Sequence, residues 1–275
     1  MLNEKASIDK LRWIMASLRD PIKGCPWDIK QTFESIVSHT IEEAYEVADA
    51  IEQKDFIELK KELGDLLFQV IFYSQLGEEE KLFAFDDVVE AVCEKLIRRH
   101  PHVFSDASLT TDADIKANWE NEKAKERQQK HSTTKHSKDN QQANLSILAD
   151  IPKNLPALSQ AAKIQKRCSH VGFDWDNRDD VFDKIAEEVE EVKAELHRDE
   201  NALSEELGDL LFAVVNLCRH AKQYPETILR KANQKFTKRF QSVEAKVNQS
   251  DKAFAEHQLN ELEAYWQQVK MEERK

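Results

Sequence analysis

Apolar side chains recur every three to four residues along most of this 275-residue chain, and no segment shows a sustained period of two. This spacing places the apolar side chains on one face of an α-helix. The pattern predicts three principal helices in each half of the chain, over residues 33–52, 58–76 and 85–99 and over residues 181–196, 203–220 and 225–246. Short polar breaks at 53–55 and 198–201 predict helical hairpins with antiparallel arms. The predicted fold class is therefore all-α.

The heptapeptide Glu-Leu-Gly-Asp-Leu-Leu-Phe occurs at residues 62–68 and again at residues 206–212. Four further matches occur in the same order in both halves. Before the heptapeptide, Trp27-Asp28 matches Trp175-Asp176, and Ile41-Glu42-Glu43-x-x-Glu46 matches Ala186-Glu187-Glu188-x-x-Glu191. After it, Lys95 and Arg99 match Lys235 and Arg239, and Trp119-x-x-x-Lys123 matches Trp266-x-x-x-Lys270. An ordered set of this kind indicates an internal duplication. We expect two tandem helical units, residues 1–125 and 146–275, joined by a polar linker at 126–145.

Each predicted unit has few helices and wide apolar faces, such as the face that carries Leu66, Leu67, Val70 and Ile71. One small unit would leave such a face uncovered, and a second copy of the chain would cover it. We therefore expect helical bundles completed by dimerisation, and a homodimer.

Composition narrows the class of protein. Charged residues make up 33% and hydrophobic residues 40% of the chain, with five Gly and six Pro, which is typical of a helical globular protein. The net charge of -12 argues against nucleic acid as a main partner. No apolar run has the length of a membrane span, and the N-terminus lacks the apolar core of a signal peptide, so we expect a cytoplasmic protein without a membrane partner. The four widely spaced cysteines are expected to be reduced, mostly buried thiols.

Acidic residues interrupt the apolar helix pattern at matching places in the two halves. Residues three apart share a helix face, so Glu188 and Glu191 point the same way, as do Glu206 and Asp209. An antiparallel hairpin brings these four carboxylates together, and the same holds in the first half for Glu43, Glu46, Glu62 and Asp65. Partly buried carboxylates at such density repel one another unless a cation is present. Oxygen ligands of this type favour Mg²⁺, so we predict a metal site in each half.

Three other interpretations of these acidic residues fit the sequence less well. A single acidic pair on a helix is most often only a solvated face, but these pairs lie among leucines, next to Gly64 or Gly208, and occur in both halves. A di-iron bundle would require Glu-x-x-His, and no histidine in the sequence has Glu three residues before it. A Ca²⁺ loop would require loop spacing with an Asp-x-Asp-x-Asp-Gly pattern, which the acids do not have.

Cationic residues follow the second acidic set. Lys235 and Arg239 share a helix face, and Lys270 lies one turn after Trp266, so this half offers positive charge and an aromatic platform for a nucleotide. The alternative is that the cations only solvate the helices and Trp266 only packs. In the first half, the segment Arg98-Arg99-His100-Pro101-His102 is either a phosphate or metal element or a basic helix end stopped by Pro.

The motifs GFDWD, EExxE, ELGDLLF and KANQKFTKRF, with GCPWD, IEEAYEV and RRHPHVF in the first half, resemble the MazG family of nucleoside triphosphate pyrophosphohydrolases over nearly the whole chain except the linker. The resemblance implies an all-α homodimer that uses Mg²⁺ to hydrolyse nucleoside triphosphates, ribo or deoxyribo and including aberrant ones, to nucleoside monophosphate and pyrophosphate. A helical protein that senses nucleotides or binds a partner without turnover remains an alternative from a different class.

The resemblance also implies roles for individual residues. Metal ligands would be Glu188, Glu191, Glu206 and Asp209, with Glu187 beside them as a supporting residue or base, and the nucleotide would be held by Lys184, Lys235, Arg239, Trp266 and Lys270. In two-unit members of the family the second unit is usually the catalytic one. We therefore expect the second half to be active, and Glu43, Glu46, Glu62 and Asp65 to form a second metal site.

Overall fold

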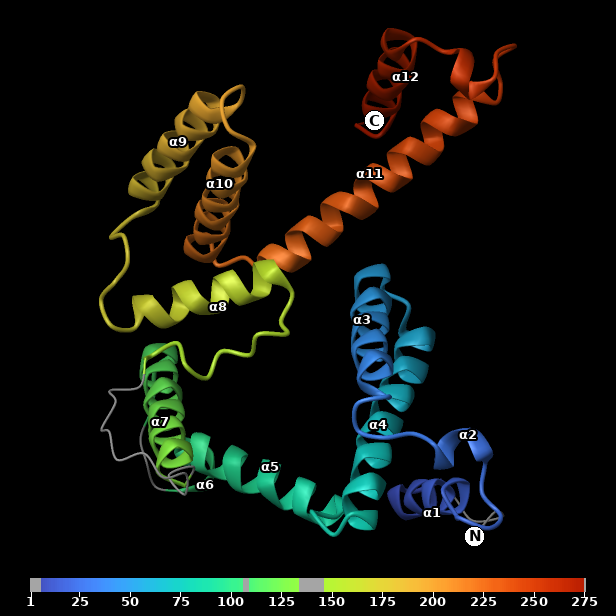
Figure 1. Ribbon diagram of the computed structural model, residues 1–275, viewed down its shortest axis with the longest axis vertical. Helices are drawn as coiled ribbons and strands as arrows, with labels where there is room; N and C mark the ends of the chain where they lie inside the picture. The colour runs from blue at the N-terminus through green and yellow to red at the C-terminus, as the bar shows by residue number, and fades with distance from the viewer. Residues whose placement is uncertain (1–5, 106–108, 134–145, 275) are drawn as a thin grey trace. The chain divides into compact units, whose positions relative to one another are not determined.

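The computed structural model describes residues 6–105, 109–133 and 146–274, and within these ranges every regular element is a helix. The chain divides into two units, residues 1–137 and 138–275 (Figure 1). The predicted all-α fold of two tandem units is confirmed. No helix in the described part of the chain combines the length and apolarity needed to cross a bilayer.

The first unit contains seven helices within its described residues. They are α1 (Ile8–Leu18), α2 (Pro26–Ile29), α3 (Val37–Gln53), α4 (Phe56–Glu79), α5 (Phe85–Arg99), α6 (Pro101–Phe104) and α7 (Asp112–Thr133). Helix α4 packs against α3, α1 and α5, and α5 also contacts α7. Helix α4 is therefore the central element of this unit.

The second unit repeats the hairpin but differs in its flanking helices. Its elements are α8 (Ala157–Ser169), α9 (Arg178–Glu195), α10 (Glu200–His220), α11 (Pro225–Val247), the 3-10 helix η1 (Phe254–Glu256) and α12 (Leu259–Glu272). Helix α10 packs against α9 and α8, and α11 packs against α12 and α8. All six principal helices that periodicity predicts are confirmed, with ends within four residues of the prediction.

Both hairpins begin their second arm with an aspartate cap. Asp55 accepts hydrogen bonds from the backbone N–H groups of Ile57 and Glu58 at 3.1 and 3.0 Å, and Asp199 accepts from those of Asn201 and Ala202 at 2.8 and 3.4 Å. These bonds satisfy N–H groups that have no partner within the helix. The short turns hold α3 beside α4 and α9 beside α10, so residues on facing sides of each hairpin meet (Figure 1).

The apolar core of the first unit lies where α1, α3 and α4 meet. Met15, Ile36, Ile71, Phe72 and Leu76 form one buried cluster there. Ile71 is only 2% exposed, so it belongs to the core of its own chain and not to an open face, whereas Leu67 and Val70 are 41% and 37% exposed. The uncovered apolar face that motivates the homodimer prediction is therefore narrower than the sequence pattern indicates.

The boundary between the units falls inside the predicted linker at 126–145. Helix α7 continues to Thr133, so the first eight of these residues are helical, and residues 134–145 lie outside the described part. The basic segment at the end of α5 forms internal ion pairs, because Arg98 and Arg99 both bind Glu126. The four cysteines are free thiols, but the prediction that most of them are buried is wrong, because Cys93 is exposed and the other three are half-buried.

Candidate metal centre and adjoining cavity

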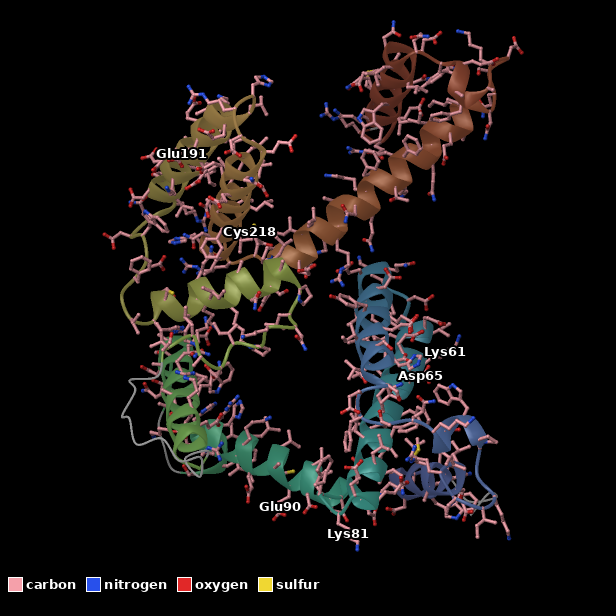
Figure 2. The ribbon with its side chains drawn as sticks, viewed as in Figure 1. Lys61, Asp65, Lys81, Glu90, Glu191 and Cys218 are labelled. Atoms are coloured by element: carbon pink, nitrogen blue, oxygen red, sulfur yellow. The ribbon has the colours of Figure 1, made fainter. Side chains whose placement is uncertain are left out.

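The α3/α4 hairpin of the first unit brings three of the four predicted acids together. One carboxylate oxygen from each of Glu43, Glu46 and Glu62 lies within 4.8 Å of the others. Asp65 lies on α4 (Figure 2) and is not part of this three-oxygen group, although its charge acts on Glu43 and helps to raise the pKa of that side chain. The first predicted metal site is thus assembled as a group of three glutamates with an aspartate nearby.

The α9/α10 hairpin assembles a corresponding group in the second unit. Carboxylate oxygens of Glu188, Glu206 and Asp209 all lie within 4.8 Å of one another. Glu191, on α9 in Figure 2, is not in this group, but its charge contributes to the raised pKa of Glu206. Each hairpin therefore brings three predicted metal ligands together and leaves the fourth predicted ligand outside the group.

Desolvation and like charge shift Glu62 of the first group and Glu206 of the second toward the protonated form. Desolvation, followed by a hydrogen bond with Glu58 and the negative charges of its neighbours, raises the pKa of Glu62 to about 6. Desolvation, followed by the charges of Glu191, Glu188 and Asp209, raises the pKa of Glu206. Both desolvation and neighbouring negative charge disfavour the ionised carboxylate, and a nearby positive charge favours it. A bound cation would supply that charge.

Glu188 is the most informative member of the second group. It is only 4% exposed, and its Oε1 binds the Nζ atom of Lys184 at 2.7 Å. Its Oε2 is buried and has no hydrogen-bond partner in the described structure. Glu187 is much more exposed and binds the same Lys184 at 3.0 Å, and these two bonds raise the pKa of Lys184. One oxygen of Glu188 is therefore fixed by a cation of the protein, and the other is free to coordinate a metal ion.

The donor set fits Mg²⁺. All three side chains in each group are carboxylates, which are hard oxygen ligands, and neither group includes a thiol or an imidazole. A buried polar atom without a partner is rare in a native protein because leaving it unpaired is costly. A divalent cation at Glu188 Oε2 would remove that cost.

A cavity of about 390 Å³ adjoins this carboxylate group. Its lining includes Glu188, Asp209 and Lys184. Most of the remaining lining is apolar or aromatic, contributed by Ile164, Phe173, Trp175, Val181, Phe212 and Ala213. A concave, mostly apolar site with a few polar groups at one end is typical of a small-molecule pocket.

A polar network forms another part of the cavity lining. Arg219 donates from Nη1 to Asp174 at 2.8 Å and from Nε and Nη2 to Asn216 Oδ1 at 3.0 and 2.7 Å, and it makes a second bond to Asp174 through Nη2. The Nε2 atom of His220 lies 3.0 Å from the same aspartate. These contacts, led by the hydrogen bonds from Arg219, lower the pKa of Asp174. The network holds Asn216 in one orientation.

The cavity also contains a buried glutamine. Gln165 on α8 is 7% exposed, and its Nε2 donates to the backbone carbonyl of Phe212 at 2.7 Å, while its Oε1 has no partner in the described structure. Sequence reasoning missed Gln165, Asn216 and Arg219 because they match neither the acidic nor the basic spacing. Asp174 and Trp175 stand within the GFDWD motif, which was a usable signal.

The other predicted nucleotide contacts lie on α11 and α12. Arg239 donates from Nε to Glu273 Oε2 at 2.7 Å and lies 5.9 Å from the ring centre of Trp266. Trp266 in turn packs against Phe236, with ring centres 5.1 Å apart. The lining of the cavity includes neither Arg239 nor Trp266, and it includes neither Lys235 nor Lys270. Of the predicted nucleotide-holding residues, Lys184 alone contributes to the cavity lining as the structure describes it.

Comparison with known proteins identifies one domain twice in this chain. The profile of the MazG nucleotide pyrophosphohydrolase domain matches residues 31–104 and again residues 178–248. A nucleoside triphosphate pyrophosphohydrolase of Escherichia coli (strain K12) is 49% identical to this chain, across 97% of the chain and 98% of the relative.

Two further comparisons involve Thermotoga maritima. Its nucleoside triphosphate pyrophosphohydrolase/pyrophosphatase MazG is 41% identical, across 95% of both chains. A crystal structure of a mazG-related protein from the same species overlaps 42% of this chain and 99% of its own at 24% identity, with a TM-score of 0.37, which is too low to support the fold by itself. The duplicated domain match and the near full-length identity, together with the carboxylate hairpin in each unit, show that this chain belongs to the MazG family of nucleotide pyrophosphohydrolases.

Proposed function

We propose that the second unit hydrolyses nucleoside triphosphates, both ribo and deoxyribo, to nucleoside monophosphate and pyrophosphate, and that it depends on Mg²⁺. The observation that carries this proposal is the buried Glu188, which has an unpartnered Oε2 and belongs to a group of three carboxylates beside a cavity. The names of the full-length relatives give the same reaction class.

In this proposal, one set of residues holds the ion and a second set orients its ligands. Glu188, Glu206 and Asp209 would hold Mg²⁺, and Glu191, whose charge acts on Glu206, stays a predicted fourth ligand. Lys184 binds one oxygen of Glu188 and so orients the other, and Glu187 binds Lys184 from the exposed side. When bound, Mg²⁺ offsets the charge of the triphosphate and makes the α-phosphorus more open to attack by water.

The choice of the second unit rests on a comparison of the two hairpins. When the identical heptapeptides are aligned, Phe72 occupies the position of Asn216, and Gln75 that of Arg219. Phe72 is 1% exposed and fills the core of the first unit, whereas Asn216 lines an open cavity in the second. The first unit has a smaller cavity of about 210 Å³, whose lining includes no member of its carboxylate group. We propose that the first unit keeps a metal site with Glu43, Glu46, Glu62 and Asp65 but is not the main catalyst.

We also propose that the chain is a homodimer. Leu207 and Leu211 of α10 are 44% and 60% exposed, and the lone-chain structure leaves open space within 4 Å of where a Cβ of Gly208 would lie. Exposed leucines next to an open glycine on a central helix favour close approach of a second helix. Phosphate contacts from Lys235, Arg239 and Lys270, and a platform role for Trp266, stay predictions.

The test is pyrophosphate release from a mixture of nucleoside triphosphates by the purified chain. We expect release with Mg²⁺ and none after EDTA is added, and we expect Mg²⁺ alone to raise the melting temperature. Nucleotide binding without any pyrophosphate release would contradict the catalytic proposal and favour a nucleotide-sensing protein.

A further inference from the structure

Gln165 has a side-chain orientation that its surroundings determine. A backbone carbonyl only accepts hydrogen bonds, so the atom that faces the carbonyl of Phe212 at 2.7 Å must be the amide nitrogen of Gln165. The amide oxygen is then fixed on the other side, where it is buried and has no partner in the described structure. Gln165 lines the cavity, and a buried acceptor without a partner at a cavity wall is a place where a ligand can supply the missing hydrogen bond.

Asn216 is fixed by a comparable constraint. A guanidinium group only donates, so the atom of Asn216 that faces Arg219 must be its amide oxygen. The amide nitrogen is thereby left as a donor on a side chain that is 3% exposed and lines the same cavity. Gln165 and Asn216 together offer an acceptor and a donor, which is the combination that the edge of a nucleobase requires.

The remaining lining suits a flat aromatic ring. Phe173 is 77% exposed and Trp175 is 42% exposed, although both belong to the lining of the cavity. Aromatic side chains left open in this way provide stacking surfaces for bases. Lys184 and two members of the carboxylate group also line this cavity, so a base bound there lies in the same pocket as the proposed metal centre.

We propose that this cavity binds the nucleobase of the substrate, and that Gln165 is a specificity-determining residue whose Oε1 accepts a hydrogen bond from an N–H group on the base edge. The proposal rests on the proposed function, because it assumes that the carboxylate group binds the phosphates through the metal ion.

The decisive experiment compares two single substitutions of buried glutamines. Gln165→Met keeps the length of the side chain and removes its hydrogen-bonding groups. Gln69→Met is the matched control, because Gln69 is also 7% exposed with an unpartnered Oε1, but it lies on α4 of the first unit and does not line this cavity. Calorimetry on the full chain would measure binding of nucleoside monophosphates and of ribose 5-phosphate, which has no base.

The expected result is selective for the base. Gln165→Met should weaken binding of at least one nucleoside monophosphate by roughly 10-fold, the effect of one buried hydrogen bond, and should leave binding of ribose 5-phosphate unchanged. The KM for the corresponding triphosphate should rise by a similar factor, and the differences in KM among the four bases should become smaller. Gln69→Met should match the wild type in every measurement. Equal affinities of Gln165→Met and Gln69→Met for all nucleoside monophosphates would overturn the proposal.

A second variant covers the case in which Gln165→Met does not fold. Ala213→Leu adds bulk to the cavity lining from a residue that is 8% exposed, so it should weaken nucleoside monophosphate binding through steric exclusion and spare ribose 5-phosphate. Unchanged nucleoside monophosphate binding in that variant would also overturn the proposal.

The two proposals fail in different ways. If the wild type releases pyrophosphate but Gln165→Met binds nucleoside monophosphates normally, the base pocket is wrong and the catalytic assignment stands. If the wild type releases none, yet Gln165→Met selectively loses monophosphate affinity, the base pocket stands and the catalytic assignment is wrong.

Discussion

Substitution of Glu188 by glutamine separates the two roles that the structure gives to this side chain. Glu188 is the buried member of the second carboxylate group, with a side chain that is 5% exposed and an ion pair to Lys184 at 2.7 Å. The change Glu188→Gln keeps the size of the side chain and removes its charge. We expect pyrophosphate release to fall by about 100-fold or more, the size of effect seen when one preorganised electrostatic group is removed from an active site.

The expected effect on stability follows from how exposed the ion pair is. Breaking a fully buried pair costs about 3–5 kcal/mol, and an exposed pair contributes about 0–1 kcal/mol. Lys184 is 34% exposed and retains Glu187 at 3.0 Å, so we expect a loss of about 1–2 kcal/mol in the metal-free protein. For a unit of this size that lowers the melting temperature by about 3–8 °C. Circular dichroism melts with EDTA would measure this change.

Asp209→Asn provides the contrasting variant. Asp209 has two acidic neighbours within 4.8 Å, so removal of its charge relieves repulsion in the metal-free protein. We expect the same loss of pyrophosphate release as for Glu188→Gln, but an unchanged or higher melting temperature in EDTA. The matched control is Glu43→Gln in the first unit, which should retain most turnover if the second unit is the catalyst.

Three results would refute this reasoning. Near wild-type pyrophosphate release by Glu188→Gln would show that its buried oxygen does not hold the catalytic ion. A rise in melting temperature with Mg²⁺ as large in Glu188→Gln and Asp209→Asn as in the wild type would place the ion elsewhere. Inactivity of Glu43→Gln with full activity of the other two would move the catalyst to the first unit.

Three other predictions address the first unit, the hairpin turn and the assembly. The folded-state pKa of Glu62 is raised to about 6 from a usual 4.5, so protonation of Glu62 favours the folded state below pH 4.5, and this stabilisation is lost as the pH rises through 6. Glu62→Gln should remove this pH dependence from melting temperatures measured in EDTA across pH 4.5–6.5. Identical pH profiles of the variant and the wild type would contradict the prediction. Asp55→Ala should destabilise the first hairpin by about 1 kcal/mol through loss of the helix cap, as measured by urea unfolding, and an unchanged midpoint would show that the cap contributes nothing. Light scattering should give twice the 31.9 kDa mass of one chain. In such a dimer, Gly208→Ala should destabilise the assembly. If Gly208→Ala instead stabilises the folded chain by about 1 kcal/mol, the open space next to Gly208 stays uncovered.

Local sequence pattern was enough to predict the six principal helices, but it did not identify others such as α1, α8 and α12. Apolar residues at a spacing of three to four identify a helix face, and polar breaks such as Lys54-Asp55 identify the turns. The pairing of acids across each hairpin was also predictable, because a short turn requires antiparallel arms. The fourth acid of each set shows the limit of this reasoning. Residues three apart differ by about 60° around a helix, so Glu191 and Asp65 share a face with their neighbours without joining the three-oxygen groups.

The character of the second site was decided only by tertiary packing. Gln165 on α8 and Asp174 before α9 are separated along the chain from Asn216 and Arg219 on α10, and no spacing rule relates them. Which oxygen of Glu188 is buried without a partner likewise depends on where Lys184 and the neighbouring helix lie. The sequence by itself determined two copies of one carboxylate hairpin, because helix periodicity and turns are local properties. Packing decided that one copy closes around Phe72 while the other leaves a cavity around Asn216, because burial depends on residues that meet only in the folded chain.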